Sequence, residues 1–300
     1  MKIAITGASG LVGGVVVQRL QHAGHQVVRM VRSAAQASVG DWLWNGETGA
    51  VDARFEEGMD TLIHLAGENI ATVRWTEERK RIIKESRVKG VRTLAAAIGR
   101  AKVRPRVVVS ASATGFYGDR GDEVCTEDSE AGVGFLAEVC RDWEGGWESV
   151  ERMGVRVVKL RIGMVLTSAG GALGKMLPLF RWGLGGVLGS GRQYWSWVHL
   201  DDLVNVVIRS MEDESLVGAV NVVAPQAVTN REFTRELAGV LGRPAWMPAP
   251  AFGLRLLLGE MADGILLCSA RVRPHRLEAA GYRFLFPELK DALGAVSAGR

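Results

Sequence analysis

Three glycines near the N-terminus form the pattern with the clearest chemistry in this chain. They follow an apolar run over residues 2–6 and precede an amphipathic stretch that starts at Leu11. Glycine lets a chain turn sharply out of a strand, and it lets backbone N–H groups approach an anion without a side chain between them. The first turn of the next helix adds free N–H groups and a positive dipole end. We therefore predict a dinucleotide pyrophosphate site, with a ligand-free turn as the alternative, made by Gly7, Ser9, Gly10, Leu11, Val12 and Gly13.

The residues after the second predicted strand, 26–31, indicate which dinucleotide binds. An NAD site usually places an acidic residue about 20 positions beyond the glycines, where it bonds the ribose 2′-hydroxyl. Here Arg32 and Ser33 follow the strand, with no Asp or Glu nearby. A guanidinium can bind a 2′-phosphate through two hydrogen bonds, whereas a carboxylate would repel it. We expect NADP(H) rather than NAD, with Arg32 and Ser33 as contacts; a solvated arginine at a strand end is the alternative.

Two further segments carry candidate cofactor contacts. After the strand predicted over 61–65, the small residues leave room for adenine and ribose, while His64 is expected to be a core histidine. On the helix predicted over 77–101, Arg87 lies on an apolar stripe at helical spacing. An unpaired charge there would be costly, so Arg87 contacts the cofactor, pairs with a carboxylate or reaches solvent, and we favour the cofactor slightly. The predicted contacts are Leu65, Ala66, Gly67 and Arg87.

The elements that position these residues alternate between strands and helices. Further strands are predicted over 106–111, 155–161 and 219–223, and further helices over 11–23, 134–153, 172–182, 200–211, 229–241 and 251–262. Near-continuous apolar strands that alternate with helices predict an α/β fold, with a doubly wound parallel sheet of the Rossmann type. We expect an NADP-binding domain over 1–165 and a smaller, partly helical, substrate-facing region over 166–300, with strand 219–223 returning to the main sheet.

Composition excludes several functional classes. The chain has 300 residues, a net charge of +4 and scattered Lys and Arg, which favours phosphate-bearing small molecules over nucleic acid. Its three cysteines fit neither a disulfide framework nor a metal site, and residues 1–30 lack the pattern of a secretory signal, so we expect a cytoplasmic protein. Charged residues interrupt the apolar stretch 251–267, which predicts a packed helix rather than a membrane span. We expect no metal, no nucleic-acid partner and no membrane partner.

Four segments together resemble the extended short-chain dehydrogenase/reductase superfamily of the sugar-nucleotide epimerase and dehydratase type. They are Thr6–Gly13, His64–Gly67, Ser110–Gly118 and Val198–Asp202. The chain is more closely similar to an atypical branch, usually labelled epimerase family protein, that carries a small C-terminal domain of unknown function. The segments that indicate this branch are Leu65–Ile70, Trp75 with Ser86 and Arg87, Phe135–Trp143, Gly183–Gly186 and, in the C-terminal domain, Pro248–Leu293.

The resemblance assigns roles to residues but also shows a departure. The superfamily uses a Tyr and a Lys four positions apart, in which the lysine lowers the pKa of the phenol. Those positions fall at Phe135 and Val139, which cannot transfer a proton. The superfamily's serine corresponds to Ser112, and Tyr117 lies in the right loop to replace the missing acid, although such turns often hold a tyrosine for packing. The resemblance adds Ser110, Gly163 and Val165 as cofactor contacts. Arg161 could pair with a phosphate or with an internal carboxylate.

Two functions remain open from the sequence. The first is an NADP(H)-binding oxidoreductase or epimerase-like protein that acts on a small substrate of the nucleotide-linked kind, with Ser112 and Tyr117 as candidate catalytic residues. The second is a non-catalytic protein that senses NADP(H) or binds other proteins, because the Tyr–Lys pair is missing and some relatives of this branch carry a cell-division label. The resemblance also implies a homodimer through helices 77–101 and 134–153.

Overall fold

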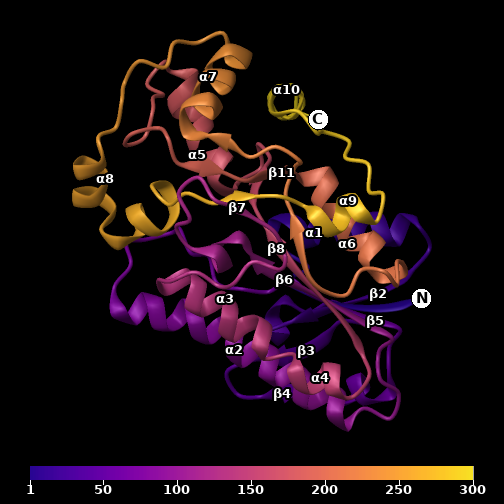
Figure 1. Ribbon diagram of the computed structural model, residues 1–300. Helices are drawn as coiled ribbons and strands as arrows, with labels where there is room; N and C mark the ends of the chain where they lie inside the picture. The colour runs from indigo at the N-terminus through magenta and orange to yellow at the C-terminus, as the bar shows by residue number, and fades with distance from the viewer. Residues whose placement is uncertain (300) are drawn as a thin grey trace.

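The computed structural model describes residues 1–299, and its centre is a twisted sheet with helices on both faces (Figure 1). The strand order is β12-β8-β6-β5-β1-β2-β3-β4, and all neighbours are parallel except β3 and β4. The strands are β1 Lys2–Thr6, β2 Gln26–Val31, β3 Trp42–Asn45, β4 Ala50–Val51, β5 Thr61–His64, β6 Val107–Ala113, β8 Arg156–Ile162 and β12 Gly218–Val222. This is the predicted Rossmann-type sheet.

Alternation along each strand sends side chains to two separate cores. In β1, Ile3 and Ile5 pack against helices α1 (Leu11–His22) and α6 (Leu200–Glu212), whereas Ala4 faces the opposite core. That second core is covered by α2 (Glu77–Arg100), α3 (Phe135–Gly145) and α4 (Glu148–Arg152). The chain crosses from β1 to β2 on one side and continues at β5 on the other, so the loops after β1 and β5 meet at the switch point.

Two predicted elements of the N-terminal part differ from the structure. The helix expected over 134–153 is two helices, α3 and α4, separated by Gly146 and Trp147. Two adjacent glycines, Gly145 and Gly146, weaken helix propensity there, and the bend buries Trp147 against the sheet. The sequence reading also missed the hairpin of β3 and β4, because only Trp42 and Trp44 of β3 are buried.

The C-terminal region forms its own core around the helices α5 (Gly171–Arg181), α7 (Asn230–Leu241) and α10 (Leu289–Ser297). Two short strand pairs join it to the rest of the chain: β9 (Met164–Leu166) with β11 (Trp197–His199), and β7 (Val124–Cys125) with β14 (Arg271–Val272). A third pair, β10 (Tyr194–Trp195) with β13 (Val228–Thr229), lies within the region. Strand β12 belongs to the main sheet, where it pairs with β8. The short helix α9 (His275–Ala279) packs beside β12.

The helix expected over 251–262 is shorter and far less buried than predicted. Helix α8 spans Ala251–Leu258, none of its residues is buried, and a single π-helical turn follows at Ala262–Leu266. Helical spacing of apolar residues predicted packing, but it could not show whether a partner surface exists. Within residues 1–299, no helix combines the length and hydropathy needed to cross a bilayer.

Candidate dinucleotide site and the polar network beside it

The loop after β1 has a geometry that requires glycine. Gly7 has a positive φ of 71°, and a Cβ there would lie 2.7 Å from the carbonyl carbon of Leu65. A Cβ on Gly13 would lie 2.1 Å from the carbonyl oxygen of Gly7, so only glycine lets α1 pack this close to the turn. The N–H of Gly10 donates to the same oxygen at 2.9 Å. The turn is therefore tight and leaves Ser9 and Gly10 exposed.

The N-terminus of α1 is open to an anion. Its N-cap is Gly10, and within the described chain no side chain caps the helix and no acidic residue occupies its first turn. The first N–H groups of a helix lack partners within it, and they carry the positive end of the dipole. Ser9, Leu11 and Val12 lie at this opening. Uncapped helix N-termini of this kind are common phosphate-binding positions in proteins.

The other predicted contacts lie on the neighbouring loops. Arg32 follows β2, which pairs in register with β1, and its side chain is exposed and makes no ion pair within residues 1–299. Ser33 accepts a hydrogen bond from the N–H of Ala35 and caps a short 3-10 turn. Leu65 and Ala66 are half-buried beside Gly7, and Gly67 is exposed. The loops after β1, β2 and β5 thus come together at one edge of the sheet.

Arg87 lies under the loop after β5 rather than in solvent. Its guanidinium donates to the carbonyl oxygens of Glu68 at 2.9 Å and Ile83 at 3.1 Å, and stacks 5.1 Å from the ring of Trp143. The Glu68 carboxylate pairs with Arg79 instead. Burial lowers the pKa of Arg87. Of the three alternatives for Arg87, pairing with a carboxylate and reaching solvent are therefore not observed, and its head lies directly beneath Gly67.

His64 is buried, as expected for a core histidine. Its Nδ1 lies 2.7 Å from the Thr6 hydroxyl, and its ring meets Trp44 and Trp147 edge-on. Burial lowers the pKa of His64 to about 3, with a smaller contribution from the nearby Arg87 charge. The imidazole is therefore neutral at physiological pH and supports the loop after β1 through Thr6.

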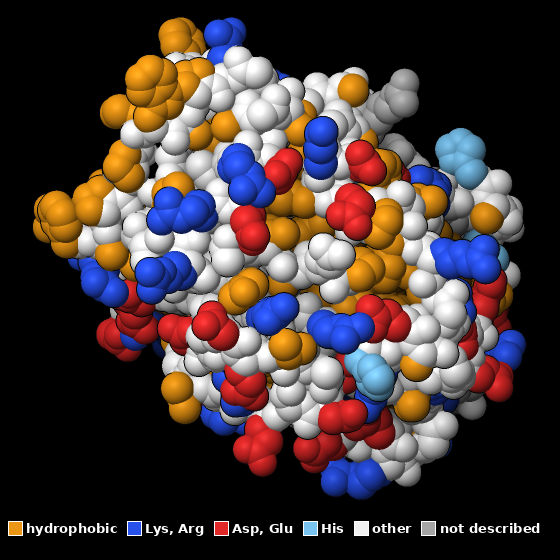
Figure 2. Space-filling model, turned by 45° about the horizontal axis from the view of Figure 1, so that its top comes forward, with side chains coloured by type: hydrophobic (Ala, Val, Ile, Leu, Met, Phe, Trp, Pro, Cys, Tyr) orange, Lys and Arg blue, Asp and Glu red, His pale blue; other side chains and the backbone are white. Residues whose placement is uncertain are grey.

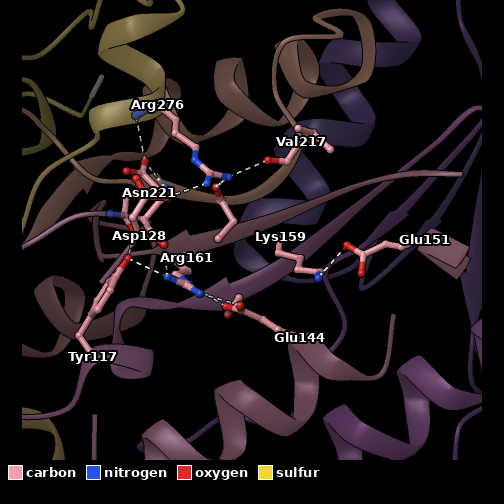
Figure 3. A network of polar contacts seen from close by, with 12 residues as sticks. Tyr117, Asp128, Glu144, Glu151, Lys159, Arg161, Val217, Asn221 and Arg276 are labelled. Carbon is pink, nitrogen blue, oxygen red and sulfur yellow. Dashed lines mark hydrogen bonds and ion pairs between the residues drawn. The ribbon is translucent and has the colours of Figure 1, made fainter. Parts of the chain in front are cut away.

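Ser112 ends in a buried ion-pair network rather than in an open cleft. Its hydroxyl donates to Glu144 at 2.6 Å. The same carboxylate receives two hydrogen bonds from Arg161, both at 2.9 Å, and Figure 3 shows this pair. Arg161 therefore pairs with an internal carboxylate. Because the Ser112 proton is committed to Glu144, its oxygen offers only lone pairs to a ligand. Ser110 is buried too, and its hydroxyl donates to the carbonyl of Ala111, so a cofactor contact through this side chain is not supported.

Tyr117 is part of the same network, and the structure contradicts the prediction that it supplies a catalytic proton. The side chain is 0% exposed. Its hydroxyl donates to Asn221 at 2.6 Å and accepts from Arg161 at 3.0 Å (Figure 3). Burial raises the pKa of Tyr117 to about 12. A buried phenol with both hydrogen-bonding roles satisfied does not deliver a proton to a substrate near neutrality.

The positions expected for the superfamily's Tyr and Lys are apolar in three dimensions as well. Phe135 packs edge-on against Trp75 at 5.1 Å, and Val139 is buried. The next residue, Cys140, is buried near Ser112, and burial raises the pKa of its thiol to about 12. A cavity of about 570 Å³ opens beside Phe135 between α2, α3 and Glu260. Its charged lining consists of Glu77, Lys80, Arg81, Lys84, Glu138, Arg141 and Glu260.

Gly163 and Val165 have structural roles that the sequence did not reveal. A Cβ on Gly163 would lie 2.6 Å from the carbonyl oxygen of Ser196, so this glycine, between β8 and β9, lets the chain pass close to the residue before β11. The backbone N–H of Gly163 donates to the carbonyl oxygen of Val222. Packing therefore explains Gly163 without a ligand. Val165 is half-buried in the pairing of β9 with β11, and its carbonyl faces Gly171 near Leu11 of the candidate site.

Sequence reasoning missed the polar residues that complete the network. Glu127 accepts from the backbone N–H groups of Asn221 at 3.0 Å and Arg276 at 3.2 Å, and the Asn221 amide donates to the carbonyl of Arg273. The two contacts of Glu127 join segments 94 and 149 positions apart in the chain. Glu144 could have been noticed, because it shares a buried helix face with Ala137 and Cys140. Among residues 1–299, no group of three His, Cys, Asp or Glu side chains could hold a metal ion.

Comparison with known proteins places this geometry in a family. Residues 3–134 match the NAD dependent epimerase/dehydratase family, and residues 249–296 match a domain of unknown function, DUF1731. An epimerase family protein of Mycobacterium bovis is 40% identical over 97% of this chain and 96% of its own length.

Solved structures agree with this assignment. Human epimerase family protein SDR39U1, whose crystal structure is described as containing NADPH, superposes with a TM-score of 0.89 at 32% identity, over 100% of both chains. A nucleoside-diphosphate sugar epimerase from Corynebacterium glutamicum gives a TM-score of 0.81 at 34% identity, with all of this chain covering 58% of that one. The chain therefore belongs to the epimerase family proteins, the group that combines the epimerase/dehydratase fold with the C-terminal domain DUF1731.

Proposed function

We propose that this protein binds NADP(H) at the edge of the sheet where β1, β2 and β5 end. The observation that carries the proposal is the loop after β1, which only glycine can form and whose helix end is open to an anion. Arg32 is exposed and free of ion pairs within residues 1–299, which suits a guanidinium that binds a 2′-phosphate. The relative with bound NADPH, which matches over its full length, supports the same cofactor.

The residues of this chain divide the binding between them. The N–H groups at Leu11, Val12 and Gly13 hold the pyrophosphate, and Arg32 holds the 2′-phosphate. Leu65, Ala66 and Gly67 flank the adenine and ribose. The bound dinucleotide supplies hydride transfer. Ser112 is only 3% exposed and its proton is held by Glu144, so we assign it no contact with the substrate.

We further propose an oxidoreductase or epimerase-like activity on a small substrate of the nucleotide-linked kind. Support comes from the family assignment and from the relative named a nucleoside-diphosphate sugar epimerase. The free cysteines Cys125, Cys140 and Cys268 are consistent with a reducing cytoplasm.

A specific observation favours a second candidate, a non-catalytic NADP(H) sensor. Phe135 and Val139 cannot transfer a proton, and Tyr117 is sealed in the core.

The two candidate functions differ in whether the protein turns over a substrate. Candidate carbonyl compounds and sugar nucleotides are mixed with the protein and NADPH, and the ultraviolet absorbance of reduced nicotinamide is followed. Tight NADPH binding without turnover of any compound would favour the sensor. Partner capture with and without NADPH then tests the sensor directly.

The cofactor proposal is tested by titration of the wild type and of Arg32→Glu with NADPH and NADH. Loss of a charged hydrogen bond costs about 1.5–3 kcal/mol, so we expect NADPH affinity to fall by about ten- to a hundredfold while NADH affinity changes little. The exposed Arg104 lies outside this site, and Arg104→Glu is the matched control. Equal weakening of both dinucleotides by Arg32→Glu would show that Arg32 does not bind the 2′-phosphate.

A further inference from the structure

A group of large apolar side chains in the C-terminal region is exposed to solvent. Trp182 is 81% exposed and Trp246 is 79% exposed, and six other side chains are more than half exposed. A soluble chain rarely exposes several large apolar residues together without an interaction that covers them. We call this set the exposed apolar face; it consists of Leu179, Trp182, Leu184, Trp246, Met247, Phe252, Leu256 and Leu257.

These residues come from three segments that lie next to one another. Leu184 bridges to Ala245, and the N–H of Met247 donates to the carbonyl of Gly185 at 3.3 Å, so the segment after α5 runs beside the segment before α8. Helix α8 follows directly, with Phe252 and Leu256 one turn apart on the same side. In Figure 2, hydrophobic side chains project at the left and upper left margin, the side on which Figure 1 places α8 and the ends of α5 and α7.

The charge around this face is one-sided. Residues 171–199 and 237–259 contain no Asp or Glu. Arg181 directly precedes Trp182, Arg243 lies three positions before Trp246, and both arginines are exposed. The first carboxylates after α8 already have partners, since Asp263 pairs with Arg255 and Glu260 with Lys80. The exposed apolar face is therefore bordered by cations without facing carboxylates from its own segments.

The composition of the exposed apolar face indicates which kind of partner covers it. A second copy of the chain would bring like charges together across the contact, which disfavours association. An apolar surface with tryptophans, leucines and flanking arginines is the pattern of a segment that lies at a membrane–water boundary. Tryptophan suits the headgroup level because its ring is apolar and its N–H is polar. Arginines near an anionic bilayer are attracted to lipid phosphates.

We propose that the exposed apolar face docks this protein on the surface of an anionic phospholipid bilayer. Trp182, Trp246 and the outer side of α8 enter the boundary between headgroups and acyl chains, and Arg181 and Arg243 bind lipid phosphates. The proposed contact is at the bilayer surface, and no helix among residues 1–299 is long and apolar enough to cross a membrane. This docking is independent of the proposed NADP(H) binding, and it differs from the sequence-based expectation of no membrane partner.

The test is flotation of the full chain with vesicles of phosphatidylcholine alone and with vesicles that also contain phosphatidylglycerol. We expect flotation with the anionic vesicles, weakened by salt, and a shift of tryptophan emission to shorter wavelength. Each arginine near the surface adds about fivefold to binding, so Arg181→Glu with Arg243→Glu is expected to abolish flotation. Trp182→Ser with Trp246→Ser is expected to abolish it as well.

Matched control variants distinguish binding through the exposed apolar face from nonspecific adsorption to vesicles. Val133 is 88% exposed and lies elsewhere, so Val133→Ser and Arg104→Glu are expected to float like the wild type. Arg32→Glu is also expected to float normally, so a failure of the cofactor proposal leaves this test intact. Near-ultraviolet circular dichroism checks that each variant is folded. Absence of flotation with anionic vesicles overturns the proposal. The proposal is also overturned if the tryptophan variant has a smaller oligomeric mass than the wild type but floats equally well. That result would mean that the exposed apolar face binds a second copy of the chain.

Discussion

Replacement of Glu144 by Ala is expected to destabilise the protein strongly, because it leaves a buried charge without its partner. The carboxylate receives hydrogen bonds from Ser112 and twice from Arg161. Arg161 is only 5% exposed, and its guanidinium lies 3.4 Å from the centroid of the Phe116 ring. It also donates to Tyr117, so it cannot swing out to solvent without breaking further contacts.

The magnitude follows from these contacts. Breaking a buried ion pair by removal of one partner costs about 3–5 kcal/mol of unfolding free energy, because the remaining charge is buried and uncompensated. A second substitution, Arg161→Met, in the Glu144→Ala background removes that charge and is expected to restore part of the loss. The buried Ser112 hydroxyl also loses its acceptor, which adds to the loss of stability.

Urea unfolding followed by circular dichroism measures the effect. The control is Glu138→Ala on the same helix, where the carboxylate is exposed and pairs with Lys84 at the surface. An exposed pair of this kind contributes about 0–1 kcal/mol. If Glu144→Ala were no more destabilising than Glu138→Ala, loss of the buried partner of Arg161 would not carry the cost of an unpaired buried charge.

Three further outcomes are expected. The pKa of His64 is about 3 in the folded protein and about 6.5 in the unfolded chain, so folding favours the neutral imidazole. The resulting contribution to the free energy of unfolding is present above pH 6.5 and is lost as the pH falls toward 3. Between about pH 7 and 4.5, the free energy of unfolding of the wild type, measured with urea, should fall by about 2–3 kcal/mol more than that of His64→Asn. The control His22→Asn, at an exposed position, should behave like the wild type. Gly13→Ala should lower NADPH affinity at least about tenfold in calorimetry, because the new Cβ would meet the carbonyl oxygen of Gly7. Gly14→Ala is the control, since its Cβ would lie 3.7 Å from the carbonyl oxygen of Ala8, which is ordinary contact. Equal NADPH affinities for the two variants would disprove the close packing at Gly13. Tyr117→Phe should cost about 1–3 kcal/mol in urea unfolding without changing NADPH affinity, and a large affinity loss would return Tyr117 to the site.

Local features of the sequence were enough to predict the backbone geometry of the loop after β1. The apolar run of β1, the glycines after it and the start of α1 are contiguous, and their geometry depends on backbone sterics that neighbouring residues set. The position of Arg32 follows from the same logic, because parallel strands end at one edge of the sheet.

The roles of Ser112, Tyr117 and Arg161 could not be read from the sequence. Each depends on a partner that the fold brings from elsewhere: Glu144 lies 32 positions from Ser112, and Asn221 lies 104 positions from Tyr117. A tyrosine in the expected loop therefore suggested catalysis, while the distant partners make it a buried structural group.

The sequence by itself determined the parallel sheet with helices between its strands and the glycine turn after the first strand, because these follow from local backbone preferences and from the alternation of strands and helices. Only the tertiary structure decided which polar side chains are sealed away and which apolar ones are left uncovered. Helical spacing gave α8 an apolar side, but burial requires a second surface, and the folded chain provides none for Phe252, Leu256 and Leu257 within residues 1–299.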